Sequence, residues 1–175
     1  MNKRRQYLID ISLISLLTAF IAVSAQLTIP LPSGVPVTMQ TFTVALCGYA
    51  LRTKKSTVSI IIYILLGLIG VPVFSGFNAG TAALFGKTGG FIFGFVFLVI
   101  ACGIASTFKN TVLKILVGTA GLAICHIFGI MWFIFLTKMN FFAAAAVVSL
   151  PFIAKDIICV ICAALLSERL QKLIK

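Results

Sequence analysis

Two adjacent ionisable residues, Lys155 and Asp156, stand inside a strongly apolar run of this 175-residue chain. Ser149 and Pro151 just before them have the residue types of a helix cap and a first-turn proline, so we expect a helix to begin there. Asp156 would lie in its second turn. If the run crosses a membrane, each charge costs about 2.5 to 3.5 kcal/mol on insertion scales, which favours a position facing a cavity. Neighbouring helical residues point in different directions and cannot easily neutralise each other. We therefore predict that the pair contacts a ligand.

Cysteine and histidine offer a second kind of chemistry. Cys159 and Cys162 form a C-x-x-C pair, a spacing found in thiol oxidoreductases, and His126 follows Cys125. The pair lies in an apolar run without the strand or turn that accompanies that motif, so core thiols and a core histidine are the favoured interpretation. Too few carboxylates and imidazoles are available to complete a metal shell. We expect no enzyme, no catalytic residue, no metal and no cofactor. A small membrane-embedded thiol enzyme is the less favoured alternative.

The sequence is too apolar for a water-soluble fold. Hydrophobic residues make up 61% of the chain, charged residues make up 10%, and the mean hydropathy is +1.20. A soluble domain has about 25% charged residues, so the surface of this protein must face lipid. Because one helical crossing needs about 20 apolar residues, we predict an all-α membrane protein.

Six apolar runs predict six transmembrane helices in a single domain over residues 1–175. Their expected ranges are Tyr7–Leu27, Val37–Leu51, Thr57–Gly70, Gly90–Phe108, Thr111–Leu136 and Phe152–Leu173. The second and third runs are short for a full crossing. We expect neighbouring helices to support them.

The distribution of basic residues supports this count. With six crossings, one side of the membrane carries eleven lysines and arginines: Lys3, Arg4, Arg5, Arg52, Lys54, Lys55, Lys109, Lys114, Arg169, Lys172 and Lys175. The other side carries Lys87 and Lys138. Cytoplasmic connections are enriched in Lys and Arg, so we predict a multi-pass protein of the cell membrane with both termini in the cytoplasm. The net charge of +11 does not indicate nucleic-acid binding. A nucleic-acid-binding protein would gather its basic residues on one polar face, whereas here they lie between the apolar runs.

Two connections on the lysine-poor side are unusual. The first, Thr28–Pro36, contains three prolines and cannot continue a helix. The second, Val71–Gly89, has 19 residues. Connections of that length are uncommon unless they bind something or are disordered, and large apolar residues such as Phe74 and Phe85 argue against disorder. We predict that this long external loop folds back as a lid over a cavity among the helices.

Small residues recur one turn apart on the first helix. Ser15 is followed by Ala19, and Thr18 by Ala22. Small residues at this spacing let helices approach closely in lipid. The face either docks a partner subunit or packs internally, and its spacing alone leaves both open.

Four segments, taken in order, are similar to one known family. They are Val35–Phe42 (VPVTMQTF), Gly67–Gly76 (GLIGVPVFSG), Gly86–Phe91 (GKTGGF), and Pro151–Phe152 together with Asp156. This pattern resembles the BioY biotin transporter family, the substrate-binding subunits of energy-coupling factor importers. The resemblance implies a six-helix subunit of the bacterial plasma membrane that captures biotin from outside. It also implies a complex with a transmembrane coupling protein and two cytoplasmic ATPases, for which the small-residue face of the first helix is a candidate docking surface.

The resemblance further implies which residues form the site. Asn78 and Asp156 would contact the ligand, while Gln40, Thr88 and Gly89 fall on positions that line or shape the pocket. The ureido ring of biotin offers two N–H donors and one carbonyl acceptor, which suit a carboxylate and an amide.

Two positions depart from the family pattern. Family members usually carry a lysine three residues after the aspartate, where this chain has Cys159, and commonly a proline where Lys87 stands. A valerate carboxylate taken out of water needs a cation or several donors. We hypothesise that Lys155 supplies this cation, with Lys87 as the competing candidate. A capture subunit of the same architecture for a different vitamin is the nearer alternative function.

Overall fold

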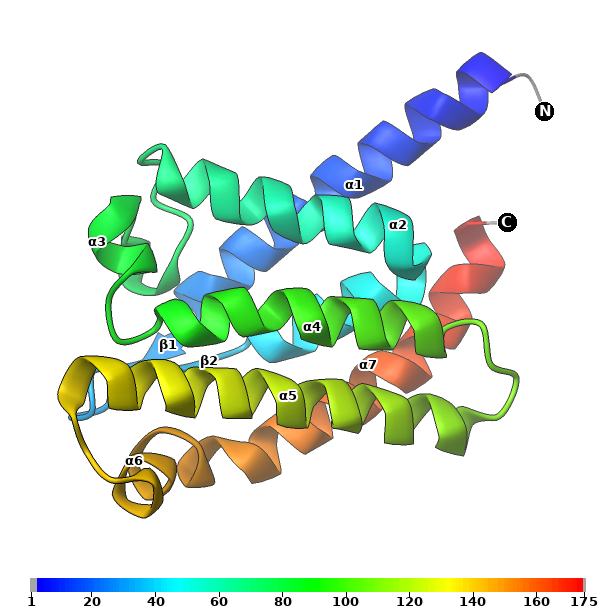
Figure 1. Cartoon of the computed structure of the whole chain (residues 1–175). Helices are drawn as coiled ribbons and strands as arrows, with labels where there is room; N and C mark the ends of the chain where they lie inside the picture. Colours follow the sequence, from blue (N-terminus) through cyan, green and yellow to red (C-terminus); the bar gives the residue numbers. More distant parts are fainter. Residues whose placement is uncertain (1–2, 175) are drawn as a thin grey trace.

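The chain folds as a bundle of helices with a small amount of β-structure at one end (Figure 1). The computed structural model describes residues 3–174. Lys175 and the side chain of Lys172, two of the cations predicted for the lysine-rich side, lie outside the described residues. The elements in chain order are α1 (Lys3–Gln26), β1 (Thr28–Ile29), β2 (Val37–Thr38), α2 (Gln40–Leu68), the 3-10 helix η1 (Ser75–Phe77), α3 (Gly80–Leu84), α4 (Gly89–Ala105), α5 (Thr111–Thr137), α6 (Phe141–Val148) and α7 (Leu150–Ile174). The prediction of a mostly helical protein is confirmed.

The second and third predicted helices are the two arms of α2. They join at Arg52, whose backbone is left-handed at φ 61° and ψ 172°. The Ser56 hydroxyl donates a 2.6 Å hydrogen bond to the Arg52 carbonyl and so helps to close the turn. The two arms run in opposite directions along the bundle, on either side of α4 in the view of Figure 1.

Three helices are long and apolar enough to cross a membrane. These are α1, α5 and the Leu150–Gln171 part of α7, while α4 is apolar but shorter. The basic residues Arg52, Lys54 and Lys55 divide α2. These helices therefore indicate a multi-pass membrane protein.

Close helix contacts depend on small residues in α4. A Cβ added to Gly94 would lie 2.8 Å from Cys125 Sγ, and one added to Gly90 would lie 2.3 Å from Trp132 Cβ, both on α5. Such distances are shorter than van der Waals contact, so only glycine permits this approach. Gly90 and Gly94 therefore serve helix packing.

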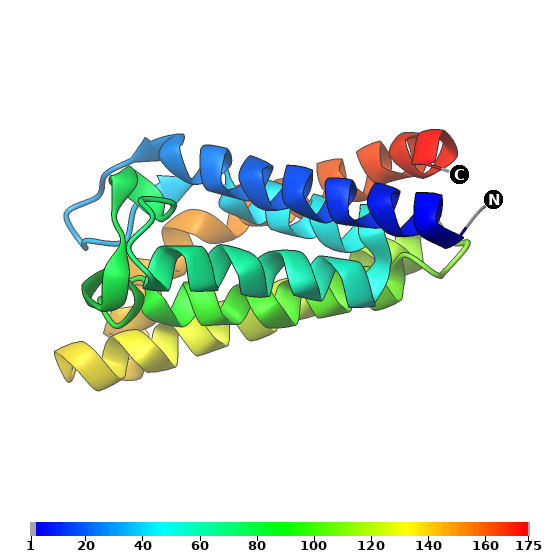
Figure 2. The same cartoon turned by 90° about the horizontal axis from the view of Figure 1, so that it is seen from above.

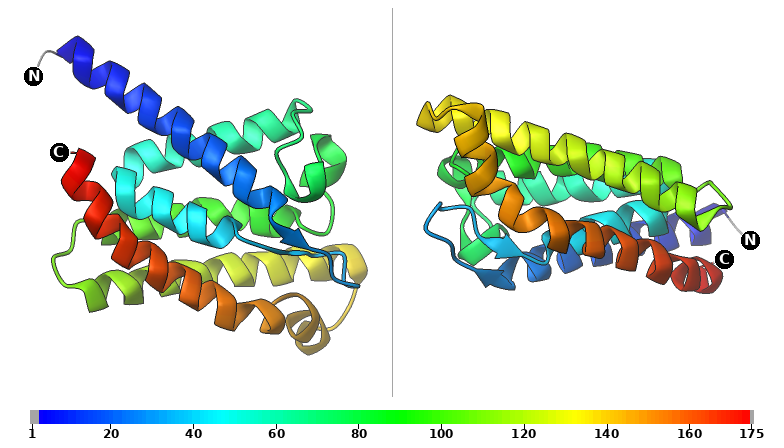
Figure 3. Two further views of the ribbon diagram at one scale, coloured as in Figure 1. Left: turned by 180° about the vertical axis from the view of Figure 1, so that it is seen from behind. Right: turned by 90° about the horizontal axis from the view of Figure 1, so that it is seen from below.

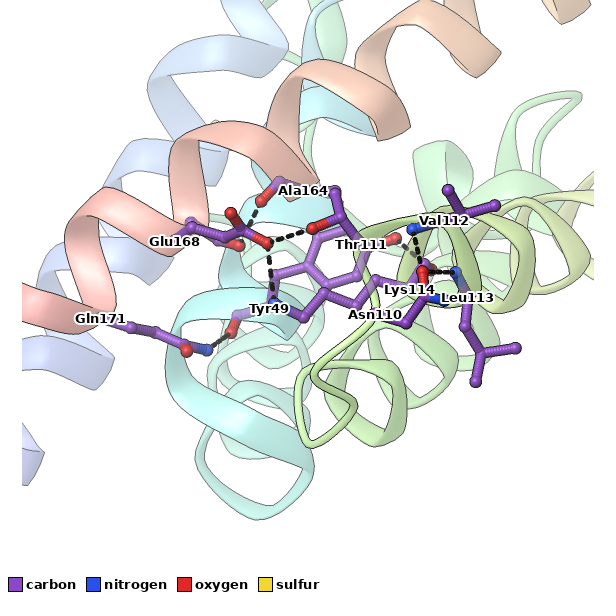
Figure 4. A network of polar contacts seen from close by, with 10 residues as sticks. Tyr49, Asn110, Thr111, Val112, Leu113, Lys114, Ala164, Glu168 and Gln171 are labelled. Atoms are coloured by element: carbon purple, nitrogen blue, oxygen red, sulfur yellow. Dashed lines mark hydrogen bonds and ion pairs between the residues drawn. The ribbon is translucent and has the colours of Figure 1, made fainter.

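Polar contacts join three helices at the end of the bundle where α7 ends (Figure 4). Lys114 Nζ lies 3.0 Å from Glu168 Oε1, and the Thr111 hydroxyl donates to the same oxygen at 2.8 Å. The Tyr49 hydroxyl donates to the Lys114 carbonyl at 3.0 Å, and Gln171 Nε2 donates to the Tyr49 carbonyl at 2.6 Å. These bonds fix α2, α5 and α7 relative to one another.

The two ends of the bundle differ in character. The beginning of α1 and the end of α7 lie at one end, together with the turn of α2 (Figure 2). The strands, η1, α3 and α6 lie at the opposite end (Figures 1 and 2). The two connections predicted to enclose a pocket therefore meet at one end of the molecule.

The segment before α7 differs from the prediction. Residues 141–148 form α6, which turns across the end of the bundle and leads into α7 (Figure 3). Ser149 directly precedes α7, as predicted for a cap residue, but its side chain has a partner on another helix. Its hydroxyl lies 2.9 Å from His126 Nδ1, because the end of α6 brings Ser149 against α5.

Candidate functional site

The Asp156 carboxylate is the centre of the most polar part of the apolar core. It lies in the second turn of α7, as predicted, and is 5% exposed. Lys155 Nζ lies 2.5 Å from Oδ1, and His126 Nε2 lies 3.3 Å from Oδ2. Oδ1 is buried, and the Lys155 ammonium faces it. The expectation that these neighbouring residues cannot easily satisfy each other is therefore wrong, because they form an ion pair.

His126 is held between two partners. Its Nδ1 pairs with the Ser149 hydroxyl at 2.9 Å, and its Nε2 faces Asp156. A neutral imidazole with its proton on Nε2 would donate to the carboxylate and accept from the hydroxyl. His126 is thus a buried histidine with hydrogen-bond partners, as expected. Its contact with the Asp156 carboxylate was not predicted.

A chain of polar contacts continues from Lys155 toward α2. Lys155 Nζ donates to the Thr38 carbonyl at 2.7 Å, and the Thr38 hydroxyl donates to Gln40 Oε1 at 3.1 Å. Gln40 Nε2 donates to the Tyr63 hydroxyl at 2.7 Å, which in turn donates to the Val73 carbonyl at 3.3 Å. These contacts connect the carboxylate with the start of the long loop.

Two adjoining cavities open at this end of the bundle. The inner cavity encloses about 50 Å³. Its lining residues come from β2 and the segment before it, and from α2, α4, α5, α7 and the long loop: Val35, Pro36, Thr38, Gln40, Thr41, Ser75, Thr88, Phe91, Ile92, Phe95, Leu122, Cys125, His126, Phe152, Lys155 and Asp156. The Asp156–Lys155–His126 group thus faces a largely apolar chamber.

The outer cavity is larger, at about 500 Å³. It lies between the proline-bearing connection and the long loop, and Pro36, Ser75 and Thr88 line both cavities. Lys87 is exposed and lines the outer cavity, and its Nζ would lie 3.4 Å from a Cβ built on Gly34. Within residues 3–174 its ammonium forms no ion pair and no hydrogen bond.

The long loop is fixed at both ends and exposed in the middle. Gln26 Nε2 donates to the Val73 and Phe74 carbonyls at 3.3 and 3.2 Å, and its Oε1 accepts from the Phe77 amide at 2.8 Å. At the other end, Trp132 Nε1 donates to the Gly86 carbonyl at 2.9 Å. Exposed residues 76–78, 81 and 82 lie between these anchors.

The predicted site residues fall into three groups. Asp156, Lys155, Gln40 and Thr88 line the inner cavity, and Thr88 lines the outer one as well. Asn78 and Lys87 line only the outer cavity, and Asn78 Nδ2 already donates to the Ser75 carbonyl at 2.7 Å. Gly89 lines neither. It is buried in the turn into α4, where an added Cβ would collide with the Leu84 carbonyl, so it shapes the turn.

Sequence analysis missed His126 and Ser149 as parts of the site. No spacing signal connects them with Asp156, because they reach it from other helices. Both are polar residues inside apolar runs, and this feature could have marked them as candidates, since buried polar groups need hydrogen-bond partners.

The small-residue face of the first helix is divided in the structure. Thr18 is buried, and its hydroxyl lies 3.2 Å from the Ser59 carbonyl of α2; Ala22 also packs against the core. Ser15 and Ala19 are exposed. Half of the predicted face therefore packs internally.

The C-x-x-C thiols do not form a site with the cavities. Cys159 is buried and Cys162 is exposed, and neither lines the inner or the outer cavity. Among the described residues, no three histidine, cysteine or acidic side chains gather as metal ligands.

Comparison with known proteins gives consistent matches over the whole chain. The family described as the BioY family matches residues 1–175. A probable biotin transporter BioY of Pyrococcus horikoshii is 38% identical over 163 residues, covering 93% of this chain and 96% of its own length. The biotin transporter BioY of Thermotoga maritima is also 38% identical, over 162 residues, covering 89% and 92%. The crystal structure of an S-component for biotin from an ECF-type ABC transporter superposes with a TM-score of 0.88 at 27% identity, covering 98% of this chain and 95% of that one.

A double-mutant cycle tests whether His126 orients Asp156. His126→Phe removes the donor to a buried carboxylate, which we expect to cost about 1–3 kcal/mol of stability. In an Asp156→Asn background the same substitution should cost much less, because the charged partner is gone. Unfolding of the four purified proteins in detergent measures this difference. Equal costs in both backgrounds would mean that the two side chains are not coupled.

Proposed function

The chain belongs to the BioY family, and from that premise we propose that it is the biotin-binding S component of an energy-coupling factor importer in the bacterial plasma membrane. The observation that carries the proposal is a buried carboxylate, paired with Lys155 and His126, that lines a cavity below a loop-covered entrance. A buried charge of this kind is expected to act on a ligand. The chain would bind and release biotin without catalysis.

The ureido ring of biotin suits the inner cavity. Asp156 Oδ1 faces Lys155, and because a carboxylate has about four lone-pair sites it can also accept a ureido N–H. Phe91, Phe95 and Phe152 supply an apolar lining for the fused rings. The family resemblance implies that Asn78 contacts the ligand and that Gln40 lines or shapes the pocket. Both amide groups already have hydrogen bonds within the protein, so either would have to change partner to contact the ligand.

The carboxylate of biotin suits Lys87 better than Lys155. Lys155 is already paired with Asp156 and with the Thr38 carbonyl, so the inner group of charges is balanced. Lys87 lines the outer cavity and has no partner among the described residues. A ligand with its ring at Asp156 and its chain passing Thr88 would extend its acid toward Lys87. This reverses the order of preference that the sequence suggested.

Binding requires the inner cavity to widen. A volume of about 50 Å³ holds a few water molecules but not a fused bicyclic ring, whereas pockets for such ligands measure about 300–1,000 Å³. Ser75 and Thr88, which separate the two cavities, belong to the Val71–Gly89 loop. We infer that this loop acts as a lid whose exposed middle moves while Gln26 and Trp132 hold its ends.

The proposed topology has six crossings in one domain of residues 1–175. Each arm of α2 counts as one crossing, so the lysine-rich end that carries both termini faces the cytoplasm. The lid and the outer cavity then face outward, where biotin arrives. Import would use a transmembrane coupling protein and two cytoplasmic ATPases. Ser15 and Ala19, exposed on α1, are the part of the small-residue face available to the coupling protein.

Native mass spectrometry with a panel of vitamins tests the function. The protein should retain biotin in preference to vitamins without a cyclic urea, and Asp156→Asn should weaken biotin binding at least about tenfold, which corresponds to about 1.4 kcal/mol. Cys162→Ser is a suitable control, because Cys162 lies outside both cavities. Retention of another vitamin instead of biotin would support the alternative S component and contradict the proposal.

Charge removal at Lys87 tests the position of the carboxylate. Lys87→Gln should weaken biotin binding about tenfold and leave binding of the uncharged biotin amide nearly unchanged. Lys138→Gln is the matched control, since Lys138 lies at the same end but its Nζ lies 5.0 Å from the centre of the Phe135 ring, outside the cavities. Isothermal titration of each variant with both ligands gives the comparison. Equal losses for the acid and the amide would exclude Lys87 as the anchor.

A further inference from the structure

A groove of about 550 Å³ lies at the end of the bundle opposite the two cavities. It lies at the turn of α2, beside α1 and the last part of α7. Its lining residues are Leu13, Ala50, Leu51, Arg52, Thr53, Lys54, Lys55 and Gln171. Three cations and an apolar wall thus border one hollow, and the biotin site makes no use of it.

Two of these cations are not compensated. Lys55 Nζ pairs with Asp10 Oδ1 at 2.6 Å. Arg52 and Lys54 are exposed, and within residues 3–174 their side chains form no ion pair and no hydrogen bond. No acidic residue of the described chain lines the groove. The groove therefore attracts anions.

The backbone at Arg52 gives a second reason to regard the groove as a site. Its φ of 61° with ψ of 172° belongs to a region that glycine occupies freely, whereas another residue there costs about 1–3 kcal/mol. The turn itself needs no arginine side chain, because the Ser56 hydroxyl closes it through the Arg52 carbonyl. What arginine adds at this position is a cation in the lining of the groove.

We infer that this groove binds the phosphate headgroup of an anionic phospholipid. The Arg52 guanidinium is suited to bidentate contact with a phosphate, with Lys54 as a second charge. Leu13, Ala50 and Leu51 offer an apolar wall to the glycerol and acyl chains. α1 also exposes Ile11 and Leu16, close to Leu13 in sequence, to the surrounding lipid. Basic groups at a membrane boundary attract anionic lipids by about 1 kcal/mol each.

Lipid binding to the full chain in neutral detergent tests the inference. Native mass spectrometry should detect retained phosphatidylglycerol in preference to phosphatidylcholine. Arg52→Gly and Lys54→Gln should each weaken phosphatidylglycerol binding about fivefold, the factor equivalent to about 1 kcal/mol. Lys109→Gln, an exposed cation of the α4–α5 connection outside the groove, should change it by less than about twofold.

Folding and ligand controls separate the possible outcomes. Arg52→Gly also relieves the left-handed backbone, so its thermal midpoint should equal or exceed that of the wild type while lipid binding falls. Biotin retention should stay unchanged in the groove variants, which makes this test independent of the proposed function. Three results would overturn the inference: an equal loss in Lys109→Gln, full competition by inorganic phosphate at the same concentration, or no preference between the two lipids. Loss of the coupling-protein complex in Arg52→Gly with unchanged lipid binding would also overturn it, in favour of a protein partner.

Discussion

A carboxylate buried between apolar helices is the constraint on which the rest of this structure depends. An isolated buried charge is too costly to keep, so Asp156 needs a cation and hydrogen-bond donors from several elements. Lys155 balances its charge, His126 contacts Oδ2, and Ser149 holds His126. Meeting this requirement brings α5, the end of α6 and the start of α7 together at one end of the bundle. The carboxylate oxygens keep further acceptor sites, which in the proposed function a ligand would use.

In the proposed function, the two cavities would divide the recognition of a polar acid between two parts of the chain. Helical residues hold the balanced charges of the inner cavity, and Lys87, unpaired among the described residues, stands on the long loop in the outer one. A ligand that neutralises Lys87 would therefore also bring the loop toward the bundle. Because Gln26 ties that loop to the end of α1, movement of the loop and movement of α1 are mechanically connected.

Much of the fold followed from the sequence, because apolar runs in lipid must satisfy their backbone groups as helices. The bounds of the predicted helices agree with the structure within four residues, and the cations at Arg52–Lys55 marked the turn inside α2. Asp156 was identified from its charge in an apolar run. The contact of His126 with Asp156, the short helix α6 and the placement of Asn78 outside the inner cavity depend on tertiary packing between distant segments. No local pattern encodes these features. The preference for Lys87 over Lys155 in the proposed function likewise depends on tertiary contacts, because Lys155 pairs with Asp156 and the Thr38 carbonyl.

An experimentally determined structure of the biotin-loaded protein tests the central claim most directly. Our account predicts a ureido nitrogen within about 2.7–3.2 Å of Asp156 Oδ1, the fused rings in a widened inner cavity, and the carboxylate beside Lys87. Biotin bound in the opposite orientation, with its acid at Lys155 and its ring in the outer cavity, would contradict the account.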